Sequence, residues 1–440
     1  MKEYEKILKR LEDKNFPSYL VGGFVRDRLM DKENKDIDIA TKARPSEIME
    51  VFKDKKLIDI GKKFGTIKVI SNNEEFEITT FRAESAYKDK RHPGEISFSD
   101  TIYEDLKRRD FTINAMALRG DKLIDPYDGR ADIGKKIIRA VGDPYERIRE
   151  DFLRSLRAVR FAVRLDFKIE PYLKLAIKKE SENIKFISSE RIADELSKIL
   201  VLDRPSRGIR LLNELGLLEK ILPEISAMIG FDQKSSHHDL SLFDHTMKVL
   251  DNSPNKLKTR MAAFFHDTGK ISTMFIDENG EGRFFSHQKK SEEIAKKRLK
   301  DLKFPKKLIK DVSLLTARHM DNTNTYTKKS VRKLLRRLGD RNIYDLFSLQ
   351  RADTLATKNP NPENIDLGLR LLEEIKNDNV PKRKKDLAIN GNDIIRLGFK
   401  EGRIIGKILD EVFNLVEEEK IENEKCQLIK YIKNNYIEVD

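Results

Sequence analysis

One stretch, residues 19–40 (YLVGGFVRDRLMDKENKDIDIA), constrains the fold more than any other part of the sequence. Its first apolar residues predict a buried strand, which breaks at Gly22 and Gly23, where the backbone can approach a ligand closely. A helix is expected next. After a polar turn, the alternation of Asp36 and Asp38 with isoleucines predicts a second strand, from one face of which both carboxylates project. The stretch therefore predicts an α/β unit that brings glycines and a carboxylate pair together.

The residue types of this stretch suggest a nucleoside triphosphate site. Two carboxylates at positions i and i+2 repel each other unless a cation lies between them, and hard oxygen ligands suit Mg²⁺. Gly22 and Gly23 would let backbone N–H groups reach a phosphate, to which the Arg26 guanidinium could also donate. A solvated strand edge is the alternative for the carboxylates alone. The combination in one strand–helix–strand unit favours the nucleotide site.

The charge balance favours a polyanionic partner. The 440 residues, enough for about three domains, include 88 Lys and Arg against 75 Asp and Glu, with a net charge of +13. Nucleic acid is the first candidate, and a lysine-rich surface without such a partner is the alternative. The single cysteine, Cys426, excludes an intramolecular disulfide and favours a cytoplasmic protein. No apolar run is long enough for a signal peptide or a membrane span.

More secondary structure is predicted around the carboxylate pair. Residues 1–16 have the amphipathic pattern of a helix, and residues 66–70 and 76–80 predict a hairpin around two asparagines. Glu77 lies in the second of these strands and is a candidate third carboxylate, since two-metal polymerase sites commonly use one. A surface glutamate on a strand is the alternative.

Residues 104–115 (EDLKRRDFTINA) form a further motif, whose charged and polar side chains could bind a ligand. The Arg109 guanidinium could bind a triphosphate through two parallel hydrogen bonds. Asp110 and Asn114 are four residues apart and could face one ligand, such as ribose hydroxyls, if the segment is helical.

Residues 150–165 (EDFLRSLRAVRFAVRL) show apolar side chains at helical spacing, with Asp151, Arg154 and Arg157 on another stripe. A charge-paired, solvated helix face is one interpretation. The other is base selection, because cytosine and adenine both present an exocyclic amine beside an unprotonated ring nitrogen. An aspartate that accepts from the amine and an arginine that donates to the nitrogen would bind either base and reject uracil and guanine. Asp151 and Arg154 are the predicted pair, and no nucleic-acid template is then needed.

These motifs, G-G-x-V-R-D followed by D-x-D, then RRDFTINA and E-D-x-x-R, resemble the class II tRNA nucleotidyltransferases (CCA-adding enzymes) and bacterial poly(A) polymerases. The resemblance implies that Asp36 and Asp38 hold two Mg²⁺ and that Asp151 and Arg154 select the base. It also implies that the partners are CTP, ATP and the tRNA acceptor arm.

Two other segments bear on which reaction of this family to expect. Residues 82–99 resemble a full-length loop that in CCA-adding enzymes helps the change from C to A addition, which favours complete CCA addition. Residues 386–409 resemble the C-terminal module of CCA-adding enzymes, which favours tRNA as the substrate.

Histidines and aspartates of the second half indicate another metal site. Its residues are His245, the adjacent His266 and Asp267, His287, His319 and Asp353. The set resembles that of the HD phosphohydrolase superfamily, and mixed imidazole and carboxylate ligands suit a transition metal better than Mg²⁺. If active, such a site would hydrolyse a phosphoester, such as a 2′,3′-cyclic phosphate or a 2′-phosphate at an RNA end. A metal kept for structure is the alternative.

Two helical segments are expected outside these sites. Residues 170–225 predict helices, with Gly216 ending one of them. Residues 328–341 predict a basic amphipathic helix whose charged side chains point mostly outward, available for phosphate contact or simply solvated. These side chains are Lys329, Arg332, Lys333, Arg336 and Arg337.

The predictions combine into an α+β protein. A small α/β nucleotidyltransferase (polymerase β-like) head at residues 1–139 is followed by an elongated all-α neck and body that includes an HD domain. Residues 140–228 form the neck, for base selection and RNA binding, residues 229–358 the HD metal-binding domain, and residues 359–440 a helical C-terminal body and tail that binds tRNA. The sequence leaves the oligomeric state open.

The predicted function is template-independent addition of CCA to the 3′ end of tRNA from CTP and ATP, with release of pyrophosphate. A poly(A) polymerase and an enzyme that adds only A or only CC are rivals within the class. An HD-type phosphohydrolase acting on RNA ends or nucleotides is a rival from another class. The intact pair of Asp36 and Asp38 argues against it, since a head kept only for RNA binding would be expected to lose one of them.

Overall fold

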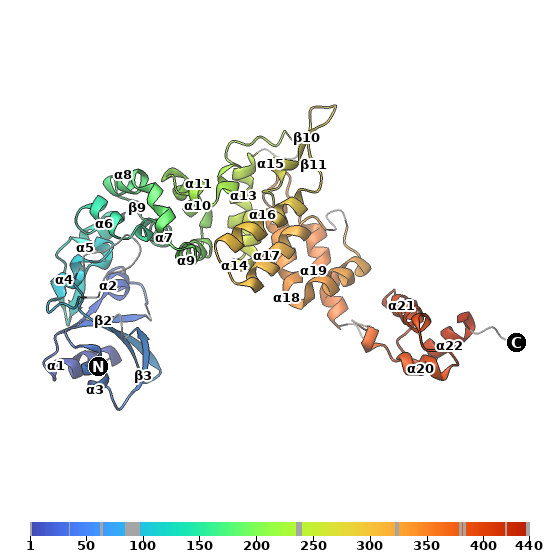
Figure 1. The fold of residues 1–440 in the computed structure, drawn as a ribbon, viewed down its shortest axis with the longest axis horizontal. Coiled ribbons are helices and arrows are strands. Elements are labelled where there is room, and N and C mark those ends of the chain that lie inside the picture. Colours follow the sequence, from blue (N-terminus) through green and yellow to red (C-terminus); the bar gives the residue numbers. More distant parts are fainter. Residues whose placement is uncertain are drawn as a thin grey trace. The chain divides into compact units, whose positions relative to one another are not determined.

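The chain divides into two compact units in a computed structural model (Figure 1). Unit 1 comprises Met1–Ala227 and Arg298–Phe304, and unit 2 comprises Met228–Lys297 and Pro305–Asp440. The structure describes residues 2–34, 36–61, 65–83, 97–234, 240–321, 325–377, 381, 384–418 and 420–436. The predicted loop over residues 82–99 lies largely outside the described residues, because 84–96 are not among them.

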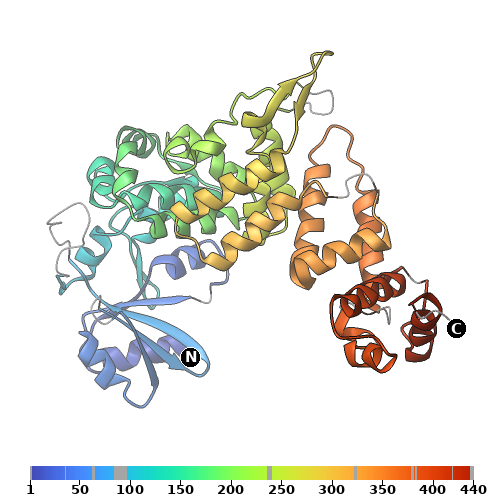
Figure 2. The ribbon, with the colours of Figure 1, turned by 45° about the vertical axis from the view of Figure 1, so that its right-hand side comes forward.

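A seven-stranded mixed sheet forms the base of unit 1, in the order β3-β4-β5-β2-β1-β6-β7 (Figure 2). The strands are β1 (Ser18–Val21), β2 (Ile37–Thr41), β3 (Lys56–Gly61), β4 (Thr66–Ser71), β5 (Glu74–Thr80), β6 (Ala117–Arg119) and β7 (Lys122–Ile124). Only β2 and β5 pair in parallel, and their register places Asp38 opposite Glu77. The predicted strand at the glycines and the predicted hairpin are confirmed.

Short helices pack on this sheet. They are α1 (Glu3–Glu12), α2 (Gly22–Leu29), α3 (Pro45–Val51), α4 (Ile102–Lys107), the 3₁₀ helix η2 (Thr112–Asn114) and α5 (Gly129–Lys135). The apolar face of α1 shares one core cluster with residues of β2, β4 and β5, including Ile39, Val69 and Phe76. The predicted N-terminal helix is therefore confirmed, and burial of one face explains why a charged helix of ten residues is stable here.

The rest of unit 1 is helical apart from a parallel pair of two-residue strands, β8 (Ile137–Ile138) and β9 (Lys168–Ile169). The helices are α6 (Pro144–Glu150), α7 (Leu153–Leu165), α8 (Pro171–Lys179), η3 (Ser181–Phe186), α9 (Ser189–Leu200), α10 (Pro205–Glu214), α11 (Leu218–Ile221) and α12 (Pro223–Ser226). Gly216 follows α10 with a φ of +70°, the left-handed conformation expected of a glycine that ends a helix.

The predicted helix over residues 150–165 is wrong at its start. Glu150 is the last residue of α6, Asp151 is extended with φ −148° and ψ 101°, and α7 begins at Leu153. The Asp151 carboxylate accepts a hydrogen bond from the backbone N–H of Leu153. This local bond satisfies a free N–H at the start of α7 and competes with continuation of the helix through residue 151.

Unit 2 is also mainly helical. Its elements are α13 (Leu242–Asn252), α14 (Leu257–Phe265), α15 (Lys270–Thr273), the hairpin β10 (Met274–Ile276) and β11 (Gly282–Phe284), α16 (His287–Asp301) up to Lys297, α17 (Lys306–Arg318), α18 (Lys328–Thr354), α19 (Glu363–Asn377), η4 (Lys384–Asp386), α20 (Gly391–Arg396), α21 (Arg403–Glu417) and α22 (Lys425–Tyr436). A separate core cluster holds the last three helices together.

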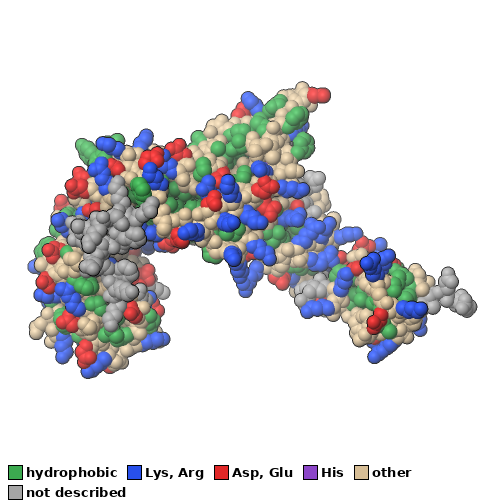
Figure 3. All heavy atoms as spheres, viewed as in Figure 1, with side chains coloured by type: hydrophobic (Ala, Val, Ile, Leu, Met, Phe, Trp, Pro, Cys, Tyr) green, Lys and Arg blue, Asp and Glu red, His purple; other side chains and the backbone are tan. Residues whose placement is uncertain are grey.

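The basic helix predicted at residues 328–341 forms, with two corrections. Gly339 has a φ of +74° and interrupts α18. Arg332, predicted to point outward, is buried and donates to the backbone carbonyl of Glu417. The other basic residues of this helix are exposed or half-buried, and lysine and arginine side chains lie on the visible face of unit 2 around α16–α18 (Figure 3). Among the described helices, none is both long and apolar enough to span a membrane.

Candidate active site

A basic cleft of about 580 Å³ lies in unit 1 and gathers residues of β1, α2, β2, α7 and the RRDFTINA segment. Nine arginines and four aspartates line it, so the cleft suits a strongly anionic ligand. Of the residues predicted for the nucleotide site, all line the cleft except Glu77. They are Gly22, Gly23, Arg26, Asp36, Asp38, Arg109, Asp110, Asn114, Asp151, Arg154 and Arg157.

The two carboxylates of the D-x-D motif differ in environment. Asp36 precedes β2 and is exposed, whereas Asp38 lies within the strand and is half-buried. Burial raises the pKa of Asp38 to about 6, and repulsion from Glu77 and Asp36 adds to this effect although Arg109 opposes it. The site therefore holds negative charge that the protein itself compensates only in part, and this fits a divalent cation.

Glu77 is a strand neighbour of Asp38 but is not part of the cleft lining. Its carboxylate lies 3.6 Å from the Lys68 ammonium and is 46% exposed. Its role as a third metal carboxylate stays a prediction.

Gly22 is required by its backbone and by its surroundings. Its φ is +65°, and a Cβ atom at this position would lie 3.0 Å from Arg109 Nη1 and 3.3 Å from Asp38 Oδ2. Any side chain here would strain the backbone and push apart an arginine and a carboxylate of the cleft. Gly23 has no such constraint, because its nearest side-chain atom, Arg26 Nη2, would be 3.5 Å from the added Cβ atom.

Asp105 holds two of the cleft arginines and was missed by the sequence prediction. Its side chain is 1% exposed, and its two oxygens accept hydrogen bonds from Arg108 and Arg109, at 3.1 Å from Arg108 Nε and 3.0 Å from Arg109 Nη2. Burial acts to raise the pKa of Asp105, but the two guanidinium groups hold it below its usual value. The spacing of three and four residues before the arginine pair was the available signal.

The expected arrangement of Asp110 and Asn114 is wrong in its geometry. The segment is not an α-helix, since only Thr112–Asn114 form one 3₁₀ turn. Asn114 Nδ2 instead donates to Asp110 Oδ1 at 3.2 Å, and Arg157 Nε donates to Asp110 Oδ2 at 2.8 Å. Burial acts to raise the pKa of Asp110, but Arg157 and Asn114 bring it below the usual value.

Arg26 is also tied into this arrangement. It is 2% exposed, and its Nε donates to Asp27 Oδ1 while Nη1 donates to Asn114 Oδ1, each at 2.7 Å. Burial lowers the pKa of Arg26, against the attraction of Asp27. Asp27 was not predicted as a site residue.

Asp151 and Arg154 both border the cleft and are joined by their backbones, since the Arg154 N–H donates to the Asp151 carbonyl at 3.0 Å, but their side chains have other partners. Asp151 Oδ2 accepts from Arg191 Nη2 at 2.6 Å, and Arg191 was missed by the sequence prediction. Arg154 contacts the Glu150 carboxylate and donates to the backbone carbonyls of Arg147 and Arg108. The expectation that Asp151, Arg154 and Arg157 share one helix stripe is wrong for Asp151, which lies outside α7.

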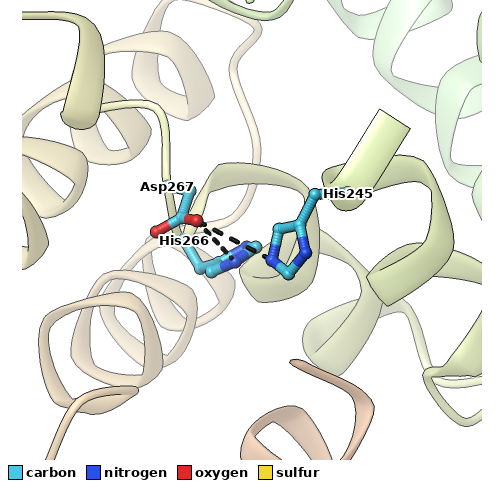
Figure 4. A group of neighbouring side chains, drawn as sticks. All are labelled: His245, His266 and Asp267. Carbon is cyan, nitrogen blue, oxygen red and sulfur yellow. Dashed lines mark ion pairs between the residues drawn. The ribbon is translucent and has the colours of Figure 1, made fainter. Parts of the chain in front are cut away.

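The histidines and aspartates predicted for a second metal site meet in unit 2, and Figure 4 shows three of them, His245, His266 and Asp267. Two groups of possible ligands share Asp267, namely His245, His266 and Asp267, and Asp267, His287 and His319. Asp353 joins them, with its Oδ1 3.0 Å from His245 Nε2 and 3.6 Å from His266 Nε2. We call these six residues the His–Asp cluster.

The hydrogen bonds of the cluster fix the histidine tautomers. Nδ1 of His266, His287 and His319 lies 2.7–2.8 Å from a backbone carbonyl, so each Nδ1 carries a proton, and in the neutral imidazole each Nε2 presents a lone pair. Nε2 of His287 and Nε2 of His319 face each other at 3.2 Å, and Asp267 Oδ1 lies 3.3 and 3.7 Å from them. Lone pairs that converge in this way repel each other unless a cation binds between them, so the donor set fits a metal ion.

Comparison with known proteins places the chain in a family. Residues 18–139 match the Poly A polymerase head domain family, residues 166–229 the family described as probable RNA and SrmB- binding site of polymerase A, and residues 283–432 tRNA nucleotidyltransferase domain 2. The fold and the cleft therefore define a nucleotidyltransferase.

Similar proteins define the family more closely. The CCA-adding enzyme of Pediococcus pentosaceus is 35% identical over 435 residues, 97% of this chain and 96% of the relative, and that of Staphylococcus aureus is 32% identical over 434 residues, 98% and 96%. The crystal structure of the Bacillus stearothermophilus CCA-adding enzyme in complex with CTP is 27% identical, covers 99% of this chain and 98% of its own, and gives a TM-score of 0.75. The chain belongs to the CCA-adding enzymes, which add CCA to the 3′ end of tRNA without a nucleic-acid template.

Substitution of Gly22 tests the geometry of the cleft. We expect Gly22→Ala to lower the rate of nucleotide addition at least about tenfold, because strain of about 1–2 kcal/mol at positive φ combines with displacement of Arg109 or Asp38. Gly120→Ala is the matched control, because Gly120 also has a positive φ of +59° but lies outside the cleft, and an added Cβ atom there would meet nothing within 4 Å. Its rate should stay within about threefold of wild type, since a factor of three corresponds to less than 1 kcal/mol. Equal effects of the two substitutions in a single-turnover assay would contradict this geometry.

The raised pKa of Asp38 predicts a pH-dependent stability. Its pKa is about 6 in the folded protein, against roughly 3.9 in an unfolded chain, so ionisation costs stability as the pH rises from about 4 to 6. Asp38→Asn should therefore raise the free energy of unfolding by on the order of 2 kcal/mol at about pH 7.5 in EDTA. The difference from wild type should largely vanish near pH 4, where the carboxyl is protonated in the folded state and about half protonated in the unfolded chain. Urea unfolding at the two pH values measures it, and an Asn variant no more stable than wild type at the higher pH would refute the assignment.

Proposed function

We propose that the basic cleft of unit 1 binds CTP and ATP in turn and transfers each nucleotide to the tRNA 3′-hydroxyl. The observation that carries this proposal is the convergence, in one cleft, of the D-x-D carboxylates, an array of arginines and the Asp151–Arg154 pair. The similar Bacillus stearothermophilus CCA-adding enzyme, which was crystallised in complex with CTP, supports it.

Asp36 and Asp38 are the residues that would hold Mg²⁺. Enzymes of this family use divalent cations, and the only partly compensated charge at Asp38 fits one. Bound there, Mg²⁺ would favour ionisation of the 3′-hydroxyl and stabilise the charge that develops as pyrophosphate is displaced in line.

The triphosphate is assigned to the glycines and the arginine pair. Gly22 and Gly23 open α2, so backbone N–H groups at the start of this helix face the cleft without a side chain in front of them. Arg109, which Asp105 holds, places its guanidinium beside these N–H groups. Its Nη1 would lie 3.0 Å from a Cβ atom added to Gly22. A held arginine loses little conformational entropy when it binds phosphate. Arg26 is buried and contributes positive charge near the glycines and Arg109.

Base selection is assigned to Asp151 and Arg154. An incoming base would exchange places with the present partners of these side chains, which are Arg191 for Asp151 and the Glu150 carboxylate and two backbone carbonyls for Arg154. Asp151 would accept from the exocyclic amine and Arg154 would donate to the ring nitrogen of cytosine or adenine. Uracil and guanine would leave like groups facing each other in a partly buried site, which is costly.

The tRNA acceptor arm is assigned to the basic helices outside the head. Exposed Lys333, Arg336 and Arg337 of α18 offer contacts to phosphates of a duplex, which proteins recognise by shape and charge. The division into a head (1–139), neck (140–228), HD domain (229–358) and C-terminal body (359–440) forms part of this proposal.

An extension assay tests the function. A tRNA transcript without its CCA end should gain two cytidines with CTP alone and complete CCA with CTP and ATP, then stop. Asp36→Ala should lower addition by at least about a thousandfold, because the cation loses one of its two carboxylate ligands, while Glu74→Ala, an exposed change on β5, should leave it unchanged. A ladder of added adenosines would indicate a poly(A) polymerase, and wild-type rates in Asp36→Ala would refute the site.

The His–Asp cluster supports a second candidate function. We propose that it binds one or two transition-metal ions, with Asp267 able to bridge the two ligand groups. A metal at this site would supply Lewis-acid activation of water for hydrolysis of a phosphoester at an RNA end, or would stabilise unit 2 without turnover.

Metal content tests the cluster. The purified enzyme should contain Mn, Fe, Co, Ni or Zn by mass spectrometry, and chelation should lower its melting temperature because buried lone pairs and carboxylates lose their shared cation. His319→Ala should lose most of this metal, whereas Asp36→Asn should retain it. Equal metal in the two variants would contradict the assignment.

A further inference from the structure

The catalytic carboxylate Asp36 stands outside the strand that carries its partner. β2 begins at Ile37, so the parallel ladder with β5 fixes Asp38 but starts one residue after Asp36. The backbone N–H of Asp36 donates instead to Asn34 Oδ1 at 2.9 Å. The position of Asp36 therefore depends on a side chain of the loop before the strand.

Asn34 is itself held by a buried carboxylate. Its Nδ2 donates to Asp27 Oδ2 at 2.7 Å, and Asp27 is 5% exposed. The two ends of the Asn34 amide thus have partners of opposite kind, an N–H at the oxygen and a carboxylate at the nitrogen. This fixes the orientation of the amide, and the bond to the charged partner is of the stronger class.

The same bonds continue into the nucleotide site. Asp27 Oδ1 accepts from Arg26, Arg26 donates to Asn114, Asn114 donates to Asp110, and Asp110 accepts from Arg157 of α7. Arg26, Asn114 and Asp110 are at most 8% exposed. A buried network of this kind has little freedom to rearrange, because each unpaired group would be costly. Asn34 joins this network to the loop that carries Asp36, because its amide bonds Asp27 on one side and the Asp36 N–H on the other.

We infer that Asn34 is a positioning residue that sets Asp36 against Asp38 for the divalent cation. This inference rests on the proposed assignment of the two aspartates as cation ligands. Partners of metal ligands typically change metal affinity or activity by about 10–100-fold when removed. A residue that acts in this way changes the cation dependence of the reaction, whereas a residue of the triphosphate or base site changes the KM for nucleotide.

The primary variant is Asn34→Ala, with Glu33→Ala, an exposed neighbour in the same loop, as the matched control. In Asn34→Ala, we expect the Mg²⁺ concentration for half-maximal CTP addition to rise about tenfold and kcat at fixed Mg²⁺ to fall about 10–100-fold. The KM for CTP at saturating Mg²⁺ should stay within about twofold. Mn²⁺ binding without tRNA or nucleotide, followed by electron paramagnetic resonance, should weaken to the same degree. The His–Asp cluster is unchanged in both variants and adds the same background.

A second pair of variants separates positioning from folding. Asn34→Asp keeps the acceptor for Asp36 but sets a carboxylate against Asp27, so it should be at least as defective as Asn34→Ala. The exchange variant Asp27→Asn/Asn34→Asp restores a donor and an acceptor between these positions with reversed roles. It should recover at least about tenfold of the Mn²⁺ affinity lost in Asn34→Asp, since a coupling of this size is common for bonded pairs.

The outcomes distinguish this inference from the assignment on which it rests. Wild-type activity in Asp36→Asn would overturn the cation site itself. An inactive Asp36→Asn together with an Asn34→Ala enzyme that matches Glu33→Ala in Mg²⁺ dependence and Mn²⁺ affinity would overturn the role of Asn34 alone. If thermal melting shows that Asn34→Ala does not fold, Asn34→Asp and the exchange variant decide, and failure of the exchange to restore Mn²⁺ affinity overturns the inference.

Discussion

The pairing of half-buried arginines with buried carboxylates is the interaction on which the cleft depends. Asp105 holds Arg108 and Arg109, and Asp110 holds Arg157. A guanidinium taken out of water without a partner costs several kcal/mol, so such an array forms only where carboxylates accompany it. The pairs keep the arginines in fixed positions at the cleft. An anionic triphosphate could accept hydrogen bonds from their remaining N–H groups.

The same principle separates two kinds of carboxylate in unit 1. Asp105 and Asp110 are neutralised by arginines, and the pKa of each lies below its usual value. Asp38 has only partial compensation from Arg109, and its pKa is raised to about 6. Structural carboxylates are thus satisfied within the protein, while Asp38 is left to be satisfied by a ligand. The His–Asp cluster of unit 2 differs, because Lys270 already lies 2.7 Å from Asp267 Oδ2, but the Nε2 atoms of His287 and His319 face each other at 3.2 Å, where a metal ion could bind them.

Local patterns in the sequence were sufficient for the parts of the fold that local interactions determine. The strand before Gly22, the carboxylate strand and the hairpin of residues 66–80 follow from alternation and turn residues, and each is present. Helical spacing continued across Asp151, however, and gave no sign that its carboxylate would cap α7 and end the preceding helix. The helical spacing of apolar residues indicates only that one face is buried. A break between two helices that keeps this face buried leaves the spacing unchanged.

Contacts between distant residues account for the other differences. Arg332 has the spacing of an exposed residue but is buried against Glu417, 85 residues later, which no local pattern indicates. The partners of the site residues were missed for the same reason, since Arg191 meets Asp151 across 40 residues and Asn114 meets Arg26 across 88. Motifs thus identified most residues that line the cleft, whereas the side chains that hold them became visible only in three dimensions.

The most direct test of the account is the selectivity of a single addition. In this enzyme, side chains of one cleft are expected to select the base. We would measure kcat/KM for CTP and UTP on a tRNA lacking its CCA end, for wild type and for Asp151→Asn, which keeps an oxygen for the Leu153 N–H but gains a donor. The account predicts a preference for CTP of at least about a thousandfold in wild type, lost by about a hundredfold or more in the variant, as for a site left with a mismatched hydrogen bond. An unchanged preference in an active, folded variant would contradict it.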